Sequence, residues 1–173
     1  MGISYSKKEK KLDLKQYSKL VNKFIKNKKA KIIFEPGRFI IGNTAIIITK
    51  VLYIKKSINK NFIILDVGMN DLMRPALYDA KHQIIPIKKI NGSIRRNIEF
   101  VGPVCETSDK FLNKKKFSKI KEGDYLALTH VGAYGMTLSS NYNTRPTIAE
   151  IMISGSKHKV IRKRQSLENL VNN

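Results

Sequence analysis

The sequence predicts a mainly β fold, an antiparallel β-sandwich or barrel-like domain that one helix and one strand precede. From residue 44 onward, short runs rich in β-branched residues alternate with turn-forming Asn, Gly and Asp. Before residue 36, apolar residues recur at steps of three and four, which is the period of a helix. These patterns divide the chain into residues 1–35, a helix and a strand, and residues 36–173, the β domain.

The first predicted element is an amphipathic helix over residues 12–29. Its apolar face consists of Leu14, Tyr17, Val21 and Phe24. Asp13 near its start and lysines near its end suit the helix dipole, and further lysines form a solvated stripe. The apolar run 31–34 predicts a short strand that ends before Pro36. A helix and a strand alone bury little area, so this unit must belong to something larger or pack onto the β domain.

Seven further runs have the composition of strands. They are residues 44–54, 62–67, 83–87, 98–101, 124–129, 148–153 and 158–163. The Lys-rich stretch 107–121 predicts a surface helix or loop instead, and the tail from Ser166 predicts a short helix or a frayed end. Short strands separated by turns at close intervals favour antiparallel pairing.

The composition, 42% hydrophobic and 27% charged, is that of a folded protein. No apolar run reaches the roughly 18–20 residues that a membrane-spanning helix needs. The N-terminal residues lack the apolar core of a secretory signal. Cys105 is the single cysteine, so no internal disulfide can form and a reducing, cytoplasmic setting is the simplest interpretation.

The formal net charge of +21 would allow electrostatic binding of nucleic acid. However, 27 of the 34 basic residues are Lys, and Lys, Ile and Asn are all abundant, as A/T-rich codons would produce. Arginine is the better side chain for bidentate contacts to phosphates and bases. We therefore favour codon bias over nucleic-acid binding as the origin of the charge.

Five segments carry residues that a plain β domain does not need: 35–38 (EPGR), 69–78 (MNDLMRPALY), 102–109 (GPVCETSD), 132–135 (GAYG) and 139–146 (SSNYNTRP). Arg38, Arg74 and Arg145 lie beside Pro or Gly, where the backbone is stiff. Arginine in a chain that otherwise uses Lys indicates a need for a planar fork, which suits a carboxylate or a phosphate. The alternative is that each Arg pairs with an acidic residue to hold a loop.

Other side chains in these segments add chemistry. Tyr78 and Tyr134 offer hydroxyl groups, and Cys105 and Glu106 offer a thiol beside a carboxylate. Together with the arginines, they favour a site for an anionic, amino-acid-like ligand. The three histidines are scattered and no metal-binding motif occurs, so we expect no metal site and ordinary packed or surface histidines.

Six segments carry a resemblance to a known family: EPGRFIIGN, DVGMNDLMRPALYDAKHQI, EFVGPVCETSD, GDYLAL, GAYGMTLSSNYNTRPTIAE and VIRKRQ. In this order and spacing they resemble the C-terminal half of diaminopimelate decarboxylases, over nearly everything from Ile33 to Gln165. MNDLMRPALY together with VCETSD distinguishes this family from the related ornithine and arginine decarboxylases. The opening MGISY resembles the end of the glycine-rich GGGLGI-Y stretch of the family's barrel.

The resemblance implies a lyase of lysine biosynthesis that converts meso-2,6-diaminopimelate to L-lysine and CO2. It implies an N-terminal (β/α)8 barrel, of which residues 1–35 would be the last remnant, and a C-terminal β domain. It also implies a homodimer and pyridoxal 5'-phosphate held as a Schiff base to a barrel lysine, with the cofactor as electron sink.

The resemblance also assigns roles to single residues. The cofactor-binding residues would be Glu35, Pro36, Gly37, Arg38 and Tyr134. The substrate-binding residues would be Arg38, Arg74, Tyr78, Glu106 and Tyr134. Arg74 and Tyr78 would hold a substrate carboxylate, whereas Glu106 would reach the distal ammonium group from the neighbouring subunit. Cys105 would be the catalytic proton donor.

The chain departs from the family at the cofactor. The Schiff-base lysine, the ring-stacking histidine and most of the glycine-rich phosphate loop lie in a segment absent here, with Gly2 as the remnant. We therefore expect no stand-alone decarboxylase activity. Half of a split enzyme that assembles with a separate barrel, an inactive gene remnant and a truncated gene model all remain open, and the motifs disfavour a basic nucleic-acid-binding module.

Overall fold

The computed structural model describes residues 2–5, 10–94 and 97–172. Its helices are α1 (Leu14–Ile25), α2 (Gly37–Ile41), α3 (Arg74–Tyr78) and α4 (Leu167–Val171), with 3-10 turns η1 (Met136–Leu138) and η2 (Tyr142–Thr144). Its strands are β1 (Ile46–Lys56), β2 (Asn61–Leu65), β3 (Ile84–Pro86), β4 (Ser93–Ile94), β5 (Ile98–Val101), β6 (Lys110–Lys114), β7 (Phe117–Ser118), β8 (Tyr125–Thr129), β9 (Glu150–Ser154) and β10 (Lys157–Arg162). The predicted mainly β class is confirmed, and each of the seven predicted runs contains a strand.

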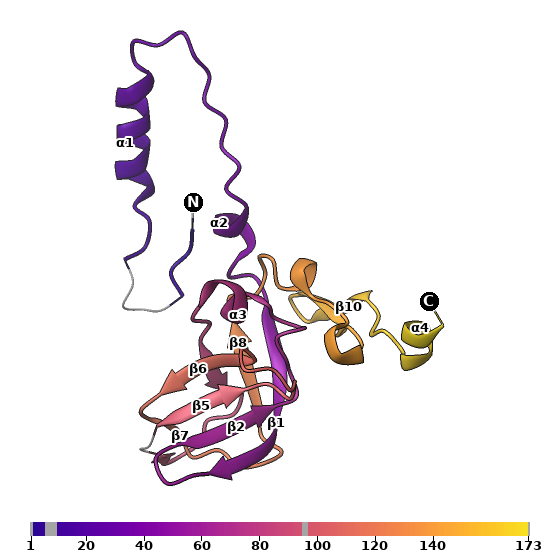
Figure 1. Cartoon of the computed structure of the whole chain (residues 1–173). Coiled ribbons are helices and arrows are strands. Elements are labelled where there is room, and N and C mark those ends of the chain that lie inside the picture. Colours follow the sequence, from indigo (N-terminus) through magenta and orange to yellow (C-terminus); the bar gives the residue numbers. More distant parts are fainter. Residues whose placement is uncertain (1, 6–9, 95–96, 173) are drawn as a thin grey trace.

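Six strands form one curled sheet in the order β3-β8-β1-β2-β5-β6 (Figure 1). All neighbours in it pair antiparallel except β2 and β5, which run parallel. A register shift between Val51 and Tyr53 interrupts the pairing of β1 with β2, and such a bulge bends a strand. The apolar residues of the inner face, including Val51, Ile63, Phe100 and Leu128, form the core.

The stretch 107–121 does not form the predicted helix or loop, because it contains β6 and β7. The exposed lysines hide an apolar pattern in which Phe111 and Phe117 are both buried. The ring of Phe117 packs edge-on against Phe100, with centroids 4.8 Å apart. Lysine is compatible with such a strand since its stem can lie along apolar surface while its ammonium group stays in water.

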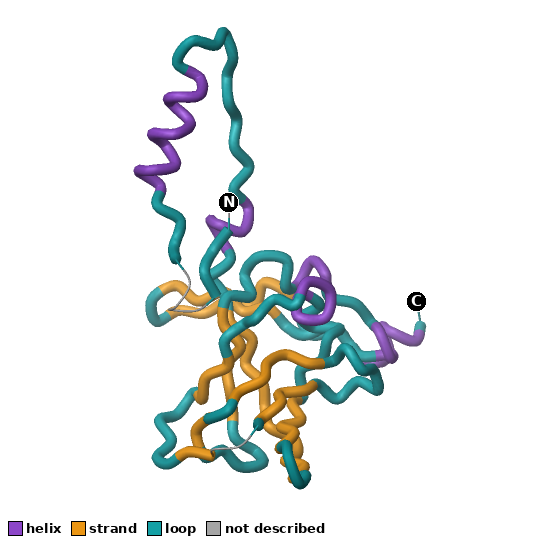
Figure 2. The backbone as a smooth tube through the Cα atoms, turned by 60° about the vertical axis from the view of Figure 1, so that its left-hand side comes forward, coloured by secondary structure: helices purple, strands orange, loops and turns teal. Residues whose placement is uncertain are grey.

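The predicted helix is present as α1, and Asp13 caps it by accepting hydrogen bonds from the backbone N–H groups of Lys15 and Gln16. The predicted strand at 31–34 is wrong, because these residues have no regular structure and Ile33 is 76% exposed. A strand needs a neighbour to accept its hydrogen bonds, and none of the described strands pairs with this run. Figures 1 and 2 show α1 and the extended run after it standing clear of the sheet.

The end of the chain forms a second exposed unit. β9 and β10 pair only with each other, and all but one of their residues are exposed. The predicted C-terminal helix is present as α4, capped by the hydroxyl of Ser166, which accepts from the N–H of Asn169. Gln165 connects this unit to the loop before β9, because its side-chain oxygen accepts hydrogen bonds from Asn141 and Thr147.

Candidate functional site

The segment Glu35–Arg38 forms the entry to α2. Pro36 takes the N-cap position, and the N–H of Gly37 donates to the carbonyl of Glu35 at 3.0 Å. Arg38 therefore lies in the first turn, and its Nη1 donates to the hydroxyl of Tyr5 at 3.1 Å. Gly2 lies so close to the Arg38 guanidinium that a Cβ atom there would overlap it. The predicted remnant of the glycine-rich loop thus lies against Arg38.

Arg74 begins α3, which Pro75 stiffens and which ends at Asp79 in the left-handed conformation (φ 49°). The Arg74 guanidinium carbon lies 5.1 Å from the ring centroid of Tyr78 and 5.3 Å from that of Tyr134. Both distances are within the range of cation–π attraction. The Nε atom of Arg74 is buried and has no hydrogen-bond partner among the described residues. A buried donor without an acceptor is costly, so an acceptor from outside these residues would be favoured here.

Tyr134 is held in an unusual backbone conformation, with φ 65°, in the segment GAYG. A bulky residue seldom adopts this left-handed region, and such strain concentrates at functional sites. Gly132 lets this segment lie directly against the Ile41 carbonyl at the end of α2, where a Cβ would overlap. The Tyr134 hydroxyl lies 3.3 Å from where a Cβ of Gly37 would be. The predicted residues of α2, α3 and this loop therefore meet, and we call Arg38, Arg74, Tyr78 and Tyr134 the arginine–tyrosine group.

A buried histidine lies against Tyr5, the hydrogen-bond partner of Arg38. His82 is fully buried, and its Nδ1 lies 3.0 Å from the Thr129 carbonyl, which can only accept, so Nδ1 carries the proton. Its ring packs edge-on against Tyr5 at 4.8 Å. Burial, and to a smaller extent the charges of Arg74 and Arg38, lower the pKa of His82 below 6.5. The sequence predicted an ordinary histidine, packed or on the surface; the structure shows His82 packed in the interior, and its contact with Tyr5 had no signal in the sequence.

Cys105 and Glu106 form a second group, on the loop 102–109 between β5 and β6. Both are exposed. Glu106 accepts weak hydrogen bonds from the Ser108 N–H at 3.3 Å and from the Tyr142 hydroxyl at 3.5 Å. No hydrogen bond, ion pair or ring contact found in the described ranges joins Cys105 or Glu106 to the arginine–tyrosine group. Within one chain the predicted residues therefore fall into two groups.

Arg145 does not belong to either group, because the chain itself occupies its guanidinium. Its Nε donates to the side-chain oxygen of Asn70 at 3.0 Å, and its Nη2 donates to the Asp66 carbonyl at 2.6 Å. Asp71 lies 3.8 Å from the same Nη2. The loop-holding interpretation is thus the correct one for Arg145, and Asn70 and Asp71 build the loop that leads to Arg74.

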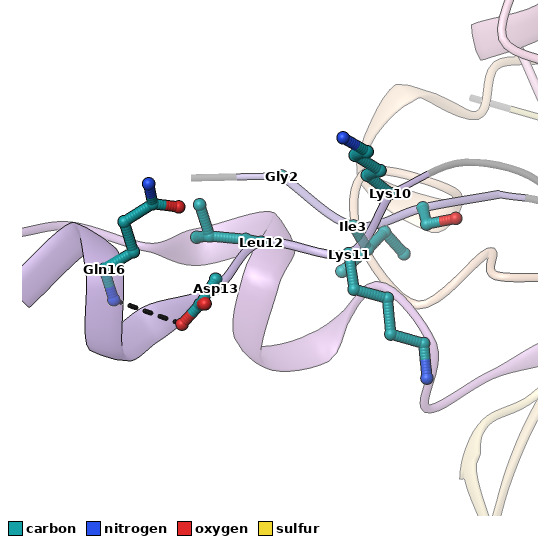
Figure 3. Close-up of a pocket in the computed structure, with 8 residues that line it drawn as sticks. Gly2, Ile3, Lys10, Lys11, Leu12, Asp13 and Gln16 are labelled. Carbon is teal, nitrogen blue, oxygen red and sulfur yellow. Dashed lines mark hydrogen bonds between the residues drawn. The ribbon is translucent and has the colours of Figure 1, made fainter.

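A cavity of about 670 Å³ lies elsewhere, between the N-terminal segment and the start of α1 (Figure 3). It is lined by Gly2, Ile3, Ser4, Lys10, Lys11, Leu12, Asp13 and Gln16, and by no member of the arginine–tyrosine group. Within the described ranges we find no cluster of metal-ligating side chains and no helix long and apolar enough to cross a membrane.

Comparisons with known proteins identify the family of the chain. Residues 9–132 match the family described as pyridoxal-dependent decarboxylase, C-terminal sheet domain. The chain is 47% identical over 156 residues to the diaminopimelate decarboxylase of Vibrio cholerae, a match that covers 90% of this chain and 37% of that protein. It is 42% identical over 176 residues to the diaminopimelate decarboxylase of Aquifex aeolicus, covering 99% of this chain and 40% of that protein.

Among solved structures, diaminopimelate decarboxylase from Helicobacter pylori complexed with L-lysine superimposes with a TM-score of 0.88 at 42% identity. This match covers 99% of the chain and 42% of that structure. The chain belongs to the pyridoxal-dependent decarboxylases, through their C-terminal sheet domain. It spans about two fifths of the length of the diaminopimelate decarboxylases that it matches.

Proposed function

We propose that this chain is the C-terminal part of a diaminopimelate decarboxylase, which converts meso-2,6-diaminopimelate to L-lysine and CO2 in the cytoplasm. The observation that carries the proposal is the position of the Arg74 guanidinium beside the rings of Tyr78 and Tyr134. Its buried Nε atom has no hydrogen-bond partner among the described residues. The names of the relatives and the L-lysine bound in the Helicobacter pylori structure support the substrate class.

The residues of the arginine–tyrosine group fit a cofactor that carries a phosphate. Two guanidinium groups without a carboxylate partner among the described residues lie there, and Gly2 and Gly37 let the backbone approach Arg38 and Tyr134 closely. Glu35, Pro36, Gly37, Arg38 and Tyr134 would hold pyridoxal 5'-phosphate. When bound, the cofactor supplies an electron sink for the bond pair that departing CO2 leaves behind.

The chain's own residues bind and orient the substrate. Arg74 presents a planar fork to a substrate carboxylate, and the Tyr78 hydroxyl, which is exposed, donates a second hydrogen bond to it. Arg38 contributes a second positive charge on the same side, and Tyr134 contacts both cofactor and substrate. These roles explain why arginine occurs here in a chain that otherwise uses lysine.

Cys105 and Glu106 act on the site of a second subunit. Their separation from Arg74 within one chain supports this arrangement, because an exposed loop with a thiol and a carboxylate is free to face a partner. Glu106 binds the distal ammonium group of the substrate through a charge-assisted hydrogen bond. The Cys105 thiol donates the proton that replaces the lost carboxylate. The functional form is then a homodimer.

The lysine that anchors the cofactor comes from a barrel outside these 173 residues, and residues 1–35 belong to the end of that barrel. The exposed apolar residues of α1, Leu14, Leu20 and Phe24, support this division, because such a face is normally buried in a larger core. The β domain then comprises residues 36–173. The chain by itself does not decarboxylate.

The test is release of CO2 from meso-diaminopimelate in the presence of pyridoxal phosphate. The purified chain alone is expected to give none, and addition of a barrel segment from a relative such as the Vibrio cholerae enzyme is expected to give turnover. Turnover by the chain alone would contradict the division of roles. Absence of turnover from a folded assembly that binds the cofactor would instead favour an inactive remnant.

A further inference from the structure

The segment that leads to Arg74 and the loop that carries Cys105 are joined by one buried carboxylate, that of Asp109. Its side chain is almost fully buried, with 2% of the residue exposed. Its Oδ1 accepts from the N–H of Met69 at 2.7 Å, and its Oδ2 accepts from the N–H of Val104 at 2.8 Å. Met69 begins the MNDLMR segment and Val104 immediately precedes Cys105, so one side chain bonds both segments.

The backbone around Asp109 is built to bring these segments together. Gly102 has no room for a side chain, because a Cβ there would overlap the Asp109 carboxylate. Gly68 would place a Cβ 2.6 Å from the Asn70 side-chain oxygen and 2.9 Å from a methyl group of Val104. The Gly102 N–H also donates to the Asp109 carbonyl at 3.0 Å. Only glycine at both positions lets the two segments approach this closely.

The segment 66–74 is fixed on its other side by Arg145. This guanidinium bonds Asn70 and the Asp66 carbonyl, and Asp71 accepts from the N–H of Gly68 at 2.9 Å. The loop 102–109 has backbone hydrogen bonds of its own, from the N–H of Glu106 to the Val104 carbonyl at 2.8 Å and from the N–H of Asp109 to the Glu106 carbonyl at 3.1 Å. Towards the Met69 segment it makes the hydrogen bond of the Asp109 carboxylate and a contact of the Ser108 hydroxyl with the Met69 sulfur at 3.7 Å. The Asp109 carboxylate is therefore a buried connection between the Met69 segment and the Cys105–Glu106 loop.

We propose that Asp109 is a positioning residue that sets the Cys105–Glu106 loop relative to the segment carrying Arg74. In each subunit, the Cys105 thiol that faces the partner's site would then have a fixed position relative to that same subunit's Arg74 segment. The positioning effect itself needs no catalysis, whereas its consequence for decarboxylation rests on the proposed function. Asp109 touches neither substrate nor cofactor in this proposal.

Two measurements on the intact chain test the positioning effect without activity. Asp109→Asn retains one acceptor oxygen and loses the other, so hydrogen exchange of the Met69 and Val104 amides, followed by NMR, is expected to accelerate about tenfold or more. In the same Asp109→Asn variant, the rate at which Cys105 reacts with a neutral thiol reagent is expected to change at least twofold. Asp124→Asn is the matched control, because Asp124 accepts from one backbone N–H, that of Lys121 at 2.8 Å, in a different turn.

A second variant protects the test against a poorly folded first one. Gly102→Ala keeps the carboxylate but displaces it, so it should reproduce the same pattern at Met69, Val104 and Cys105. Unchanged Val104 exchange and unchanged Cys105 reactivity in both variants would overturn the proposal. The proposal would also be overturned if the core amide of Ile63 lost as much protection from exchange as the Met69 and Val104 amides. Asp109 would then stabilise the whole fold and not the two segments.

In the assembly with a barrel segment, Asp109→Asn is expected to lower kcat on the order of tenfold or more, because a misplaced proton donor slows the chemical step. Asp124→Asn should leave kcat unchanged. An Asp109→Asn assembly with normal kcat would contradict the catalytic consequence of the proposal. An inactive wild-type assembly would refute the proposed function instead and leave the exchange and thiol results to decide the positioning effect.

Discussion

At the scale of single residues, Arg74 and Arg145 show how one residue type acquires opposite roles. Both lie before a proline and both had the same sequence signal. The Arg145 guanidinium donates hydrogen bonds to the Asn70 side chain and the Asp66 carbonyl. The Arg74 guanidinium lies against two tyrosine rings, and its Nε has no hydrogen-bond partner among the described residues. The difference depends on which acceptors the fold brings near each side chain. Long-range contacts of this kind, over 75 positions for Arg145 and Asn70, are not visible in a sequence.

Arg74→Lys is predicted to lower kcat/KM of the assembled enzyme by roughly tenfold to a hundredfold, the worth of a hydrogen bond to a charged group. Lysine keeps the charge but loses the planar fork and the stacking on Tyr78 and Tyr134. The control is Arg162→Lys, because Arg162 forms an exposed pair with Glu150 on the β9–β10 hairpin. Steady-state kinetics with meso-diaminopimelate measures both, and equal kcat/KM for the two variants would exclude a special role for Arg74.

His82 predicts a pH dependence of stability. Its folded pKa lies below 6.5, so as the pH falls below 6.5 the unfolded chain takes up a proton that the folded chain does not. The contribution of His82 to the free energy of unfolding should therefore decrease as pH falls from 7 towards 5, by at most about 1.4 kcal/mol per unit of pKa difference.

The measurement is urea unfolding of the chain and of His82→Gln at several pH values. Glutamine can still donate to the Thr129 carbonyl but does not titrate. The chain and His82→Gln have all other ionisable groups in common. The unfolding free energy of the chain minus that of His82→Gln should therefore become smaller, or change sign, as pH falls. A difference that stays constant with pH would show that His82 is protonated equally in both states.

At the scale of elements, the sequence predicted most of the strands because their β-branched runs are interrupted by clear turn residues. It failed at 107–121, where the lysines around Phe111 and Phe117 concealed a strand pattern. It failed at 31–34 for the opposite reason, since an apolar, β-branched run becomes a strand only when another strand is available to pair with it. Of the predicted site, a common site for the arginines and tyrosines of α2, α3 and the GAYG loop was indicated by the residue types, and the role of each residue came from the family resemblance. The contribution of Asp109, a single polar residue between two loops, was not predictable.

Two phenylalanines test the contrast between these elements. Phe117→Ala should cost about 3–5 kcal/mol of unfolding free energy, because this ring is 8% exposed and packs against Phe100. Phe24→Ala on α1 should change stability by no more than about 0.5 kcal/mol, because Phe24 is 63% exposed. Chemical denaturation measures both. A large loss from Phe24→Ala would mean that α1 packs onto this chain's own core.

At the scale of the whole molecule, the chain presents a curled six-stranded β core with uncovered apolar surface on its projecting parts. Helix α1 and the β9–β10 hairpin lie away from the six-stranded sheet (Figure 1), and their exposed apolar residues include Phe24, Ile153 and Ile161. An exposed apolar surface on projecting elements usually marks an interface. It agrees with a chain that spans about two fifths of its relatives' length, and with the proposal that other polypeptide completes the site.

The most direct measurement of the shared site is a mixing experiment on the assembly with the barrel segment. Arg74→Ala and Cys105→Ala chains, each inactive in its own dimers, are combined and allowed to exchange subunits. Random exchange makes half of the dimers mixed, each with one intact site, so decarboxylation is expected to return to about a quarter of the wild-type rate. No recovery from mixed dimers shown to have formed would contradict a site built from the Arg74 of one subunit and the Cys105 of the other.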